Sequence, residues 1–88
     1  MPDEIQDKIR AKSIEIVDDQ GRTRISMRTD GDETYFYIYD LEGGLKVSLE
    51  MEDEGNAGVT FYHKSVARAY LGVDKDGKER KGILRDPD

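Results

Sequence analysis

Acidic side chains recur at three places in the chain and are candidate ligands for calcium. The three groups are Asp30, Asp32 and Glu33; Glu52, Asp53 and Glu54; and Asp74, Asp76 and Glu79. Calcium prefers carboxylate oxygens, and the segment 74–77 carries part of the residue pattern of an EF-hand loop. With Gly77 at loop position 6, however, Gly72 takes position 1 and Ile83 position 12, where oxygen ligands are required. We therefore expect these segments to be solvated turns and predict no metal site and no cofactor.

Aromatic side chains form a second candidate site. The chain has 5 tyrosines, and Tyr37, Tyr39 and Tyr62 fall on the same side of corresponding predicted strands, next to Phe36 and Phe61. A tyrosine ring offers a flat apolar area with a polar tip, which suits a sugar or a peptide. Cross-strand packing or a subunit interface explains the same residues, and we favour that explanation.

Catalytic chemistry finds little support in the sequence. His63 is the single histidine, and no serine or cysteine arrangement accompanies it. General acid–base or nucleophilic catalysis needs converging partners, so we predict that the protein is not an enzyme. Basic residues at corresponding positions, Arg24, Lys46 and Arg68, face many carboxylates and favour cross-strand ion pairs over an anion site.

Composition narrows the classes of partner. The 88 residues carry a net charge of −6, so a nucleic-acid backbone would be repelled. There is no cysteine, no apolar run long enough to cross a membrane and no apolar segment typical of a signal peptide. We expect a soluble acidic protein, located in a virion or in the cytoplasm, that binds neither nucleic acid nor a membrane.

The chain repeats itself. Residues 14–27 align with residues 36–49, a third copy covers residues 59–71, and Ile83 begins an apparent fourth. Starts at 14, 36, 59 and 83 give spacings of 22, 23 and 24 residues. A period of this size is typical of stacked supersecondary units, none of which can bury its apolar side alone.

Each copy has the pattern of a two-stranded hairpin. Apolar residues such as Ile25 and Met27 alternate with polar ones such as Arg24 and Ser26, which predicts one dry and one wet face. Turns are predicted at 18–21 and 41–44, where Asp and Gly favour positive φ. The third copy lacks this turn sequence, and acidic links at 29–34, 52–58 and 74–82 join the copies.

Two segments follow from these patterns. Residues 1–12 form a predicted N-terminal helical segment, because Pro2, the early acids and the later bases suit a helix over residues 2–12, with Ile5 and Ile9 on one face. Residues 13–88 form the hairpin-repeat domain. The predicted fold is mainly β, an antiparallel meander of three to four repeats.

Residues 14–27 have the order strand, Asp-x-x-Gly turn, Arg, strand. This order resembles that of uncharacterised bacterial and phage β-hairpin repeat proteins. The resemblance covers about residues 10–86, and the third copy departs from it at His63 and Ser65. In design, the chain is similar to trimeric β fibre shafts and virion appendages. This resemblance implies a structural role and supplies no catalytic residue.

A meander of this kind has no second layer to cover its apolar side. Either copies of the chain pack face to face, or the sheet closes into a small barrel. We expect the first: a homo-oligomer, and a trimer by analogy with the fibre shafts, that acts as a non-enzymatic structural or assembly module of a phage or bacterial appendage. The alternative is a small barrel that binds a carbohydrate or peptide on its tyrosine face.

Overall fold

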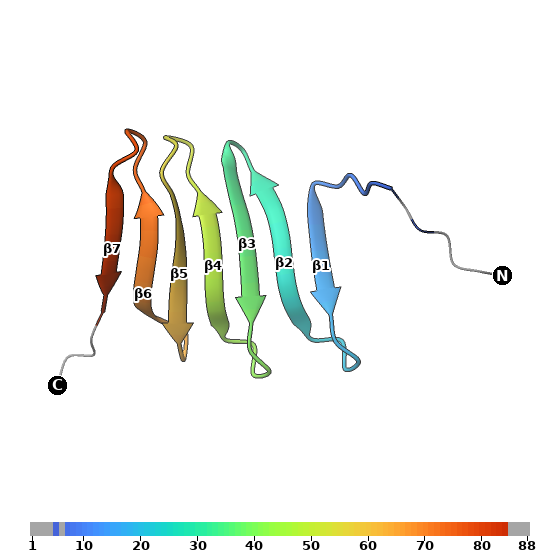
Figure 1. The fold of residues 1–88 in the computed structure, drawn as a ribbon. Helices are drawn as coiled ribbons and strands as arrows, with labels where there is room; N and C mark the ends of the chain where they lie inside the picture. The colour runs from blue at the N-terminus through green and yellow to red at the C-terminus, as the bar shows by residue number, and fades with distance from the viewer. Residues whose placement is uncertain (1–4, 6, 85–88) are drawn as a thin grey trace.

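The computed structural model describes Ile5 and residues 7–84, and it contains one sheet of 7 strands. Every neighbouring pair is antiparallel, and the strands lie in sequence order from β1 to β7 (Figure 1). Their bounds are β1 Ser13–Val17, β2 Thr23–Asp30, β3 Glu33–Tyr39, β4 Leu45–Met51, β5 Ala57–His63, β6 Val66–Val73 and β7 Glu79–Ile83. The predicted all-β antiparallel meander is confirmed.

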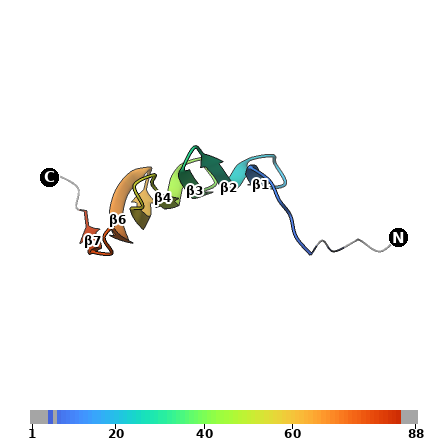
Figure 2. The same ribbon diagram turned by 90° about the horizontal axis from the view of Figure 1, so that it is seen from above.

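The sheet is open and is a single twisted layer. Viewed along its edge, no other element of the described chain covers either face (Figure 2). Strands β1 and β7 lie at opposite edges and do not pair, so the alternative of a small closed barrel is wrong. Closure would require the two edge strands to meet, and six antiparallel steps in one plane carry them apart instead.

The predicted N-terminal helix is not found in the described part of the chain. Ile5 and residues 7–12 are irregular, and the remaining residues of the predicted helix lie outside the described residues. Nucleating an eleven-residue helix is costly unless its apolar face can dock. Ile5 and Ile9 are 93% and 72% exposed, so this stabilisation is missing.

Four of the six connections share one turn geometry. In the turns at 18–22, 40–44, 52–56 and 74–78, the first residue donates its N–H to the carbonyl of the fifth, and the fourth residue is a glycine that donates back to the first. Gly21, Gly43, Gly55 and Gly77 have φ between 80° and 96°. A three-residue loop with glycine in this left-handed region is a common hairpin connection.

The other two connections are two-residue turns. Asp30 pairs with Glu33 around Gly31, whose φ is 62°, and His63 pairs with Val66 around Lys64 and Ser65, whose φ values are 52° and 64°. The third copy therefore keeps a hairpin without the Asp-x-x-Gly sequence. Left-handed conformation at two non-glycine residues carries a backbone cost.

The predicted boundaries between turns and links are wrong in two places. Residues 52–56 and 74–78, expected as parts of long acidic links, form the same turn as 18–22. Ile83, expected to begin a fourth copy, ends β7 and pairs with Ala69, so it lies in the row of Ile16 and Ile38. Lys81 occupies the position that corresponds to Ile14, because β7 begins inside the segment expected to be a loop.

Candidate functional site

The apolar face of the sheet is the candidate functional surface. Strand pairing aligns its side chains in two rows that run across the strands. One row is Ile14, Met27, Phe36, Leu49, Val59, Leu71 and Lys81; the other is Ile16, Ile25, Ile38, Val47, Phe61, Ala69 and Ile83. Alternation along each strand places these residues on one side, as predicted from the sequence. We call this surface the apolar face.

The apolar face is incompletely buried within one chain. Among the described residues, no hydrophobic side chain is buried, and the two buried residues are Ser26 and Ser48. Leu49 is 52% exposed, Phe61 49% and Leu71 57%. Contiguous exposed apolar surface is uncommon on soluble monomers and marks an interaction site.

Strand β7 ends the apolar face with charges. Glu79 pairs with Val73 and Lys81 with Leu71, so both follow the apolar alternation of β6. A charged residue on the inner side of an edge strand discourages further strand addition and gives the face a polar rim. The sequence pattern assigned both residues to a link, and only the strand register reveals their place.

The predicted aromatic set is divided between the two faces. Tyr37, Tyr39 and Tyr62 share one face, as expected, and this is the polar face, whereas Phe36 and Phe61 belong to the rows of the apolar face. Neighbouring residues in a strand point to opposite sides, so Phe36 and Tyr37 cannot serve one surface. A single site containing all five residues is therefore not formed within one chain.

The tyrosines of β3 contact one another along the strand. The rings of Tyr35 and Tyr37 are 5.6 Å apart and tilted by 39°, and those of Tyr37 and Tyr39 are 6.3 Å apart and tilted by 73°. The Arg28 guanidinium lies 5.4 Å from the Tyr35 ring centre. The rings of Tyr37 and Tyr39 therefore meet edge to face, and the three rings of β3 do not share one plane.

The phenol groups of β3 are hydrogen-bonded to carboxylates. Tyr35 donates to Glu33 at 2.9 Å and Tyr37 donates to Glu50 at 3.1 Å. Partial burial, together with the charge and hydrogen bond of Glu50, raises the pKa of Tyr37 to about 12. The hydrogen bond to Glu33, with partial desolvation, raises the pKa of Tyr35. Both phenols therefore stay neutral donors at neutral pH.

Small polar residues lie beneath these rings at the centre of the polar face. Ser48 is 2% exposed and pairs with Tyr37 on one side and Thr60 on the other, and its hydroxyl is 3.1 Å from that of Tyr62. Tyrosines thus cover the middle of the sheet in place of a second layer. Ser48 was not singled out from sequence, because an alternating polar position predicts solvent exposure.

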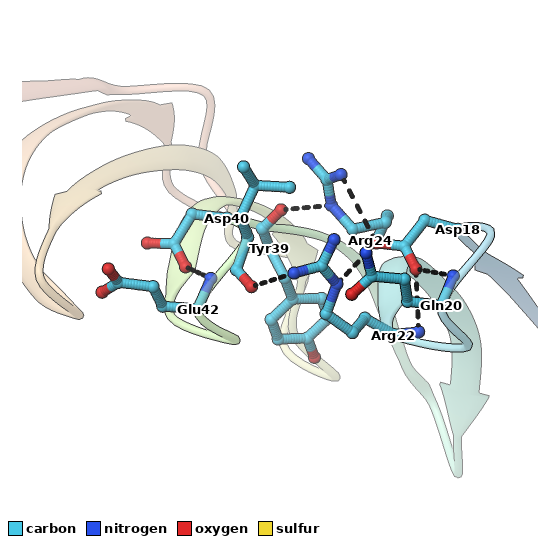
Figure 3. A network of polar contacts seen from close by, with 8 residues as sticks. Asp18, Gln20, Arg22, Arg24, Tyr39, Asp40 and Glu42 are labelled. Carbon is cyan, nitrogen blue, oxygen red and sulfur yellow. Dashed lines mark hydrogen bonds and ion pairs between the residues drawn. The ribbon is translucent and has the colours of Figure 1, made fainter.

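A network of polar contacts joins neighbouring turns at one end of the sheet (Figure 3). Asp18 accepts from the backbone of Gln20 at 2.9 Å and of Arg22 at 3.0 Å, and from the Arg22 side chain at 2.8 Å. Arg22 also donates to the carbonyl of Leu41 at 3.3 Å. Partial desolvation raises the pKa of Asp18, but these hydrogen bonds and the Arg22 charge outweigh it and lower the pKa overall.

Arginines at corresponding positions reach across to the next hairpin. Arg24 donates to the Tyr39 carbonyl and Arg68 to the Leu84 carbonyl, both at 3.2 Å. Arg24 also lies 3.8 Å from Asp18, so one of the predicted ion pairs is present, but its better-formed contact is to backbone. These guanidinium groups fix the ends of neighbouring strands.

The acidic turns use their carboxylates internally. Asp18, Asp40 and Asp74 each accept hydrogen bonds from the backbone N–H groups two and four residues later. Within the described residues, no group of three or more His, Cys, Asp or Glu side chains is placed to hold a metal ion. His63 ends β5, beside a two-residue turn.

No protein-family model matches the chain, and no curated protein matches it. Among the described residues, no helix has the length and apolar character needed to cross a membrane.

Proposed function

We propose that this protein is a non-enzymatic assembly module that associates with further copies of itself through the apolar face. The observation that carries the proposal is an ordered sheet of 7 strands in which no described hydrophobic residue is buried. A second layer is the usual way to cover such a face, and the described chain provides none.

Exposed apolar side chains favour self-association. Complete burial of a large aliphatic or aromatic side chain is worth about 1.5 to 3 kcal/mol relative to exposure. Leu49, Phe61 and Leu71 each leave roughly half of their surface exposed, at 52%, 49% and 57%. Face-to-face packing of two copies would bury the exposed part of these side chains on both copies and gain the corresponding burial free energy for each of them. This gain supports self-association.

A pair of sheets is the simplest assembly that covers the apolar face. The expectation of a trimer comes from the similarity in design to trimeric β fibre shafts, and it stays a prediction. One open sheet is covered by one other sheet, since two layers already enclose a core about 10 Å thick. Membership of a phage or bacterial appendage remains a prediction from the resemblance.

Light scattering coupled to gel filtration, supported by sedimentation equilibrium, tests the proposal. The wild-type chain should have a mass that is a multiple of 10.0 kDa and should dissociate on dilution. Leu71→Glu should shift the protein to monomer, because the carboxylate would be desolvated in the interface.

Leu41→Glu is the matched control. Leu41 is 57% exposed, as Leu71 is, but lies in the turn at 40–44, away from the apolar face. It should leave the mass unchanged. A wild-type monomer at every accessible concentration contradicts the proposal, as does equal dissociation by the two variants.

A further inference from the structure

We infer that two copies pack with their apolar faces together about a two-fold axis that runs along the middle strand, β4. This inference rests on the proposed self-association and adds its geometry. Three features of the sheet carry it: the area of the face, the position of the charges on β7, and the hollow beside Ala69.

The area needed for a stable interface requires that the two apolar faces overlap completely. Seven strands spaced by about 4.8 Å, each roughly 20 Å long, give a face of about 670 Å² per copy. Two such faces total about 1,340 Å², close to the lower end of the range for a stable interface, roughly 1,200 to 2,000 Å². A packing that is offset by two strands would fall below this range. Full overlap places β4 over β4 of the second copy, because β4 is the middle strand.

The charges of β7 select the direction of the axis. An axis perpendicular to the strands places β7 over β7 of the second copy. If the row that contains Lys81 then contacts the same row of the second copy, Lys81 lies against Lys81. An axis along β4 instead places β7 over β1, where Glu79 lies over the corner at which Lys12 precedes β1 of the second copy. Opposite charges at the rim stabilise this orientation, and like charges oppose the other.

Side-chain volumes agree with the axis along β4. A hollow of about 310 Å³ lies beside Ala69, between Phe61, Leu71 and Ile83. In this packing β6 lies over β2 of the second copy, and Ala69 faces Ile25, which occupies the same row. The larger side chain enters the hollow left by the smaller one, as interdigitating sheet faces require.

Cysteine cross-linking tests the geometry, because the chain contains no cysteine. Leu49 lies on the proposed axis, so Leu49→Cys in two copies would be about 10 Å apart, the spacing of packed sheets. That exceeds the reach of a disulfide, so the probe is a short bismaleimide. Leu71→Cys is the matched control, since it shares the row, the residue type and a similar exposure, but lies two strands from the axis on each copy.

We expect cross-linked dimer from Leu49→Cys, none from Leu71→Cys alone, and cross-linking restored when Leu71→Cys is mixed with Met27→Cys. The mixture of Leu71→Cys and Met27→Cys leaves Leu49 unchanged, so it tests the direction of the axis even if Leu49→Cys weakens association. A dimeric wild type whose Leu71→Cys variant cross-links with itself, or whose mixed pair does not, overturns the axis while leaving self-association standing. A monomeric wild type in light scattering overturns both.

Discussion

Gly72→Ala should destabilise the sheet far more than the same change at Gly82. Gly72, the penultimate residue of β6, pairs directly with Gly58, the second residue of β5. A Cβ atom at residue 72 would lie 2.5 Å from the Ala57 carbonyl oxygen and 2.9 Å from the Gly58 Cα. Both obstacles are backbone, so relief requires the two strands to move apart. At Gly82 the obstacle is the Tyr70 ring, 2.7 Å away, which can rotate.

The expected magnitude follows from two opposing effects. Overpacking that shifts backbone costs about 1 to 3 kcal/mol. Replacing a strand glycine by alanine regains about 0.5 to 1 kcal/mol of conformational free energy. With the middle of each range, about 2 and about 0.75 kcal/mol, the net loss in the free energy of unfolding for Gly72→Ala is about 1.2 kcal/mol. For Gly82→Ala the effects nearly cancel.

Urea unfolding followed by circular dichroism measures the difference. With a slope near 1 kcal/mol per molar urea, Gly72→Ala should lower the midpoint by about 1 M or more. Protein concentration must be equal for all variants, since self-association would add to apparent stability. A midpoint for Gly72→Ala at or above that of the wild type, or an equal loss for Gly82→Ala, would refute the close-approach argument.

Three further predictions concern turns and titration. Lys64→Gly should raise the free energy of unfolding by about 0.5 to 1 kcal/mol, because it removes left-handed strain at φ 52°. Ser65→Gly should raise it less, because that variant also loses the hydrogen bond that Ser65 Oγ accepts from the Leu45 N–H. Equal urea midpoints for the two variants would count against this difference. The raised pKa of Tyr37 means that its contribution is complete below the unfolded value near 10 and is lost as pH rises toward about 12. Tyr37→Phe should flatten this alkaline loss in thermal unfolding, and an unchanged profile would show that the phenol does not contribute. The lowered pKa of Asp18 means that its contribution to stability is present above the ordinary aspartate pKa of 3.8 and is lost as pH falls through the lower folded pKa. Asp18→Asn should weaken the acid dependence of stability, and an acid profile like that of the wild type would contradict it.

Local patterns predicted much of this fold because they act within a few residues. Alternation of Ile25 and Met27 with Arg24 and Ser26 predicted strand β2 and assigned its faces. The Asp18 carboxylate and the positive φ of Gly21 predicted the first hairpin. The predicted helix is not found among the described residues, because a helix this short needs tertiary packing and not only a local pattern. Ile5 and Ile9, which would supply that packing, are exposed.

The candidate site was predicted only in part. The row containing Leu49 and Leu71 follows from period two, whereas Phe36 and Tyr37, named together as a possible interface or ligand face, lie on opposite faces of the sheet. Burial of Ser48 depends on Tyr62, which is 14 residues away in the chain and lies on the neighbouring strand, β5. Such a contact has no signal in the local pattern.

The amino-acid sequence by itself determined that this chain makes antiparallel strands with one apolar face, because backbone sterics and side-chain alternation act locally. Tertiary structure alone decided that the sheet stays open, that Glu79 and Lys81 edge the apolar face, and that Gly58 meets Gly72. Strand register fixes these features, and register accumulates over six turns of two lengths. A change of one residue in any turn would move every later side chain to the other face.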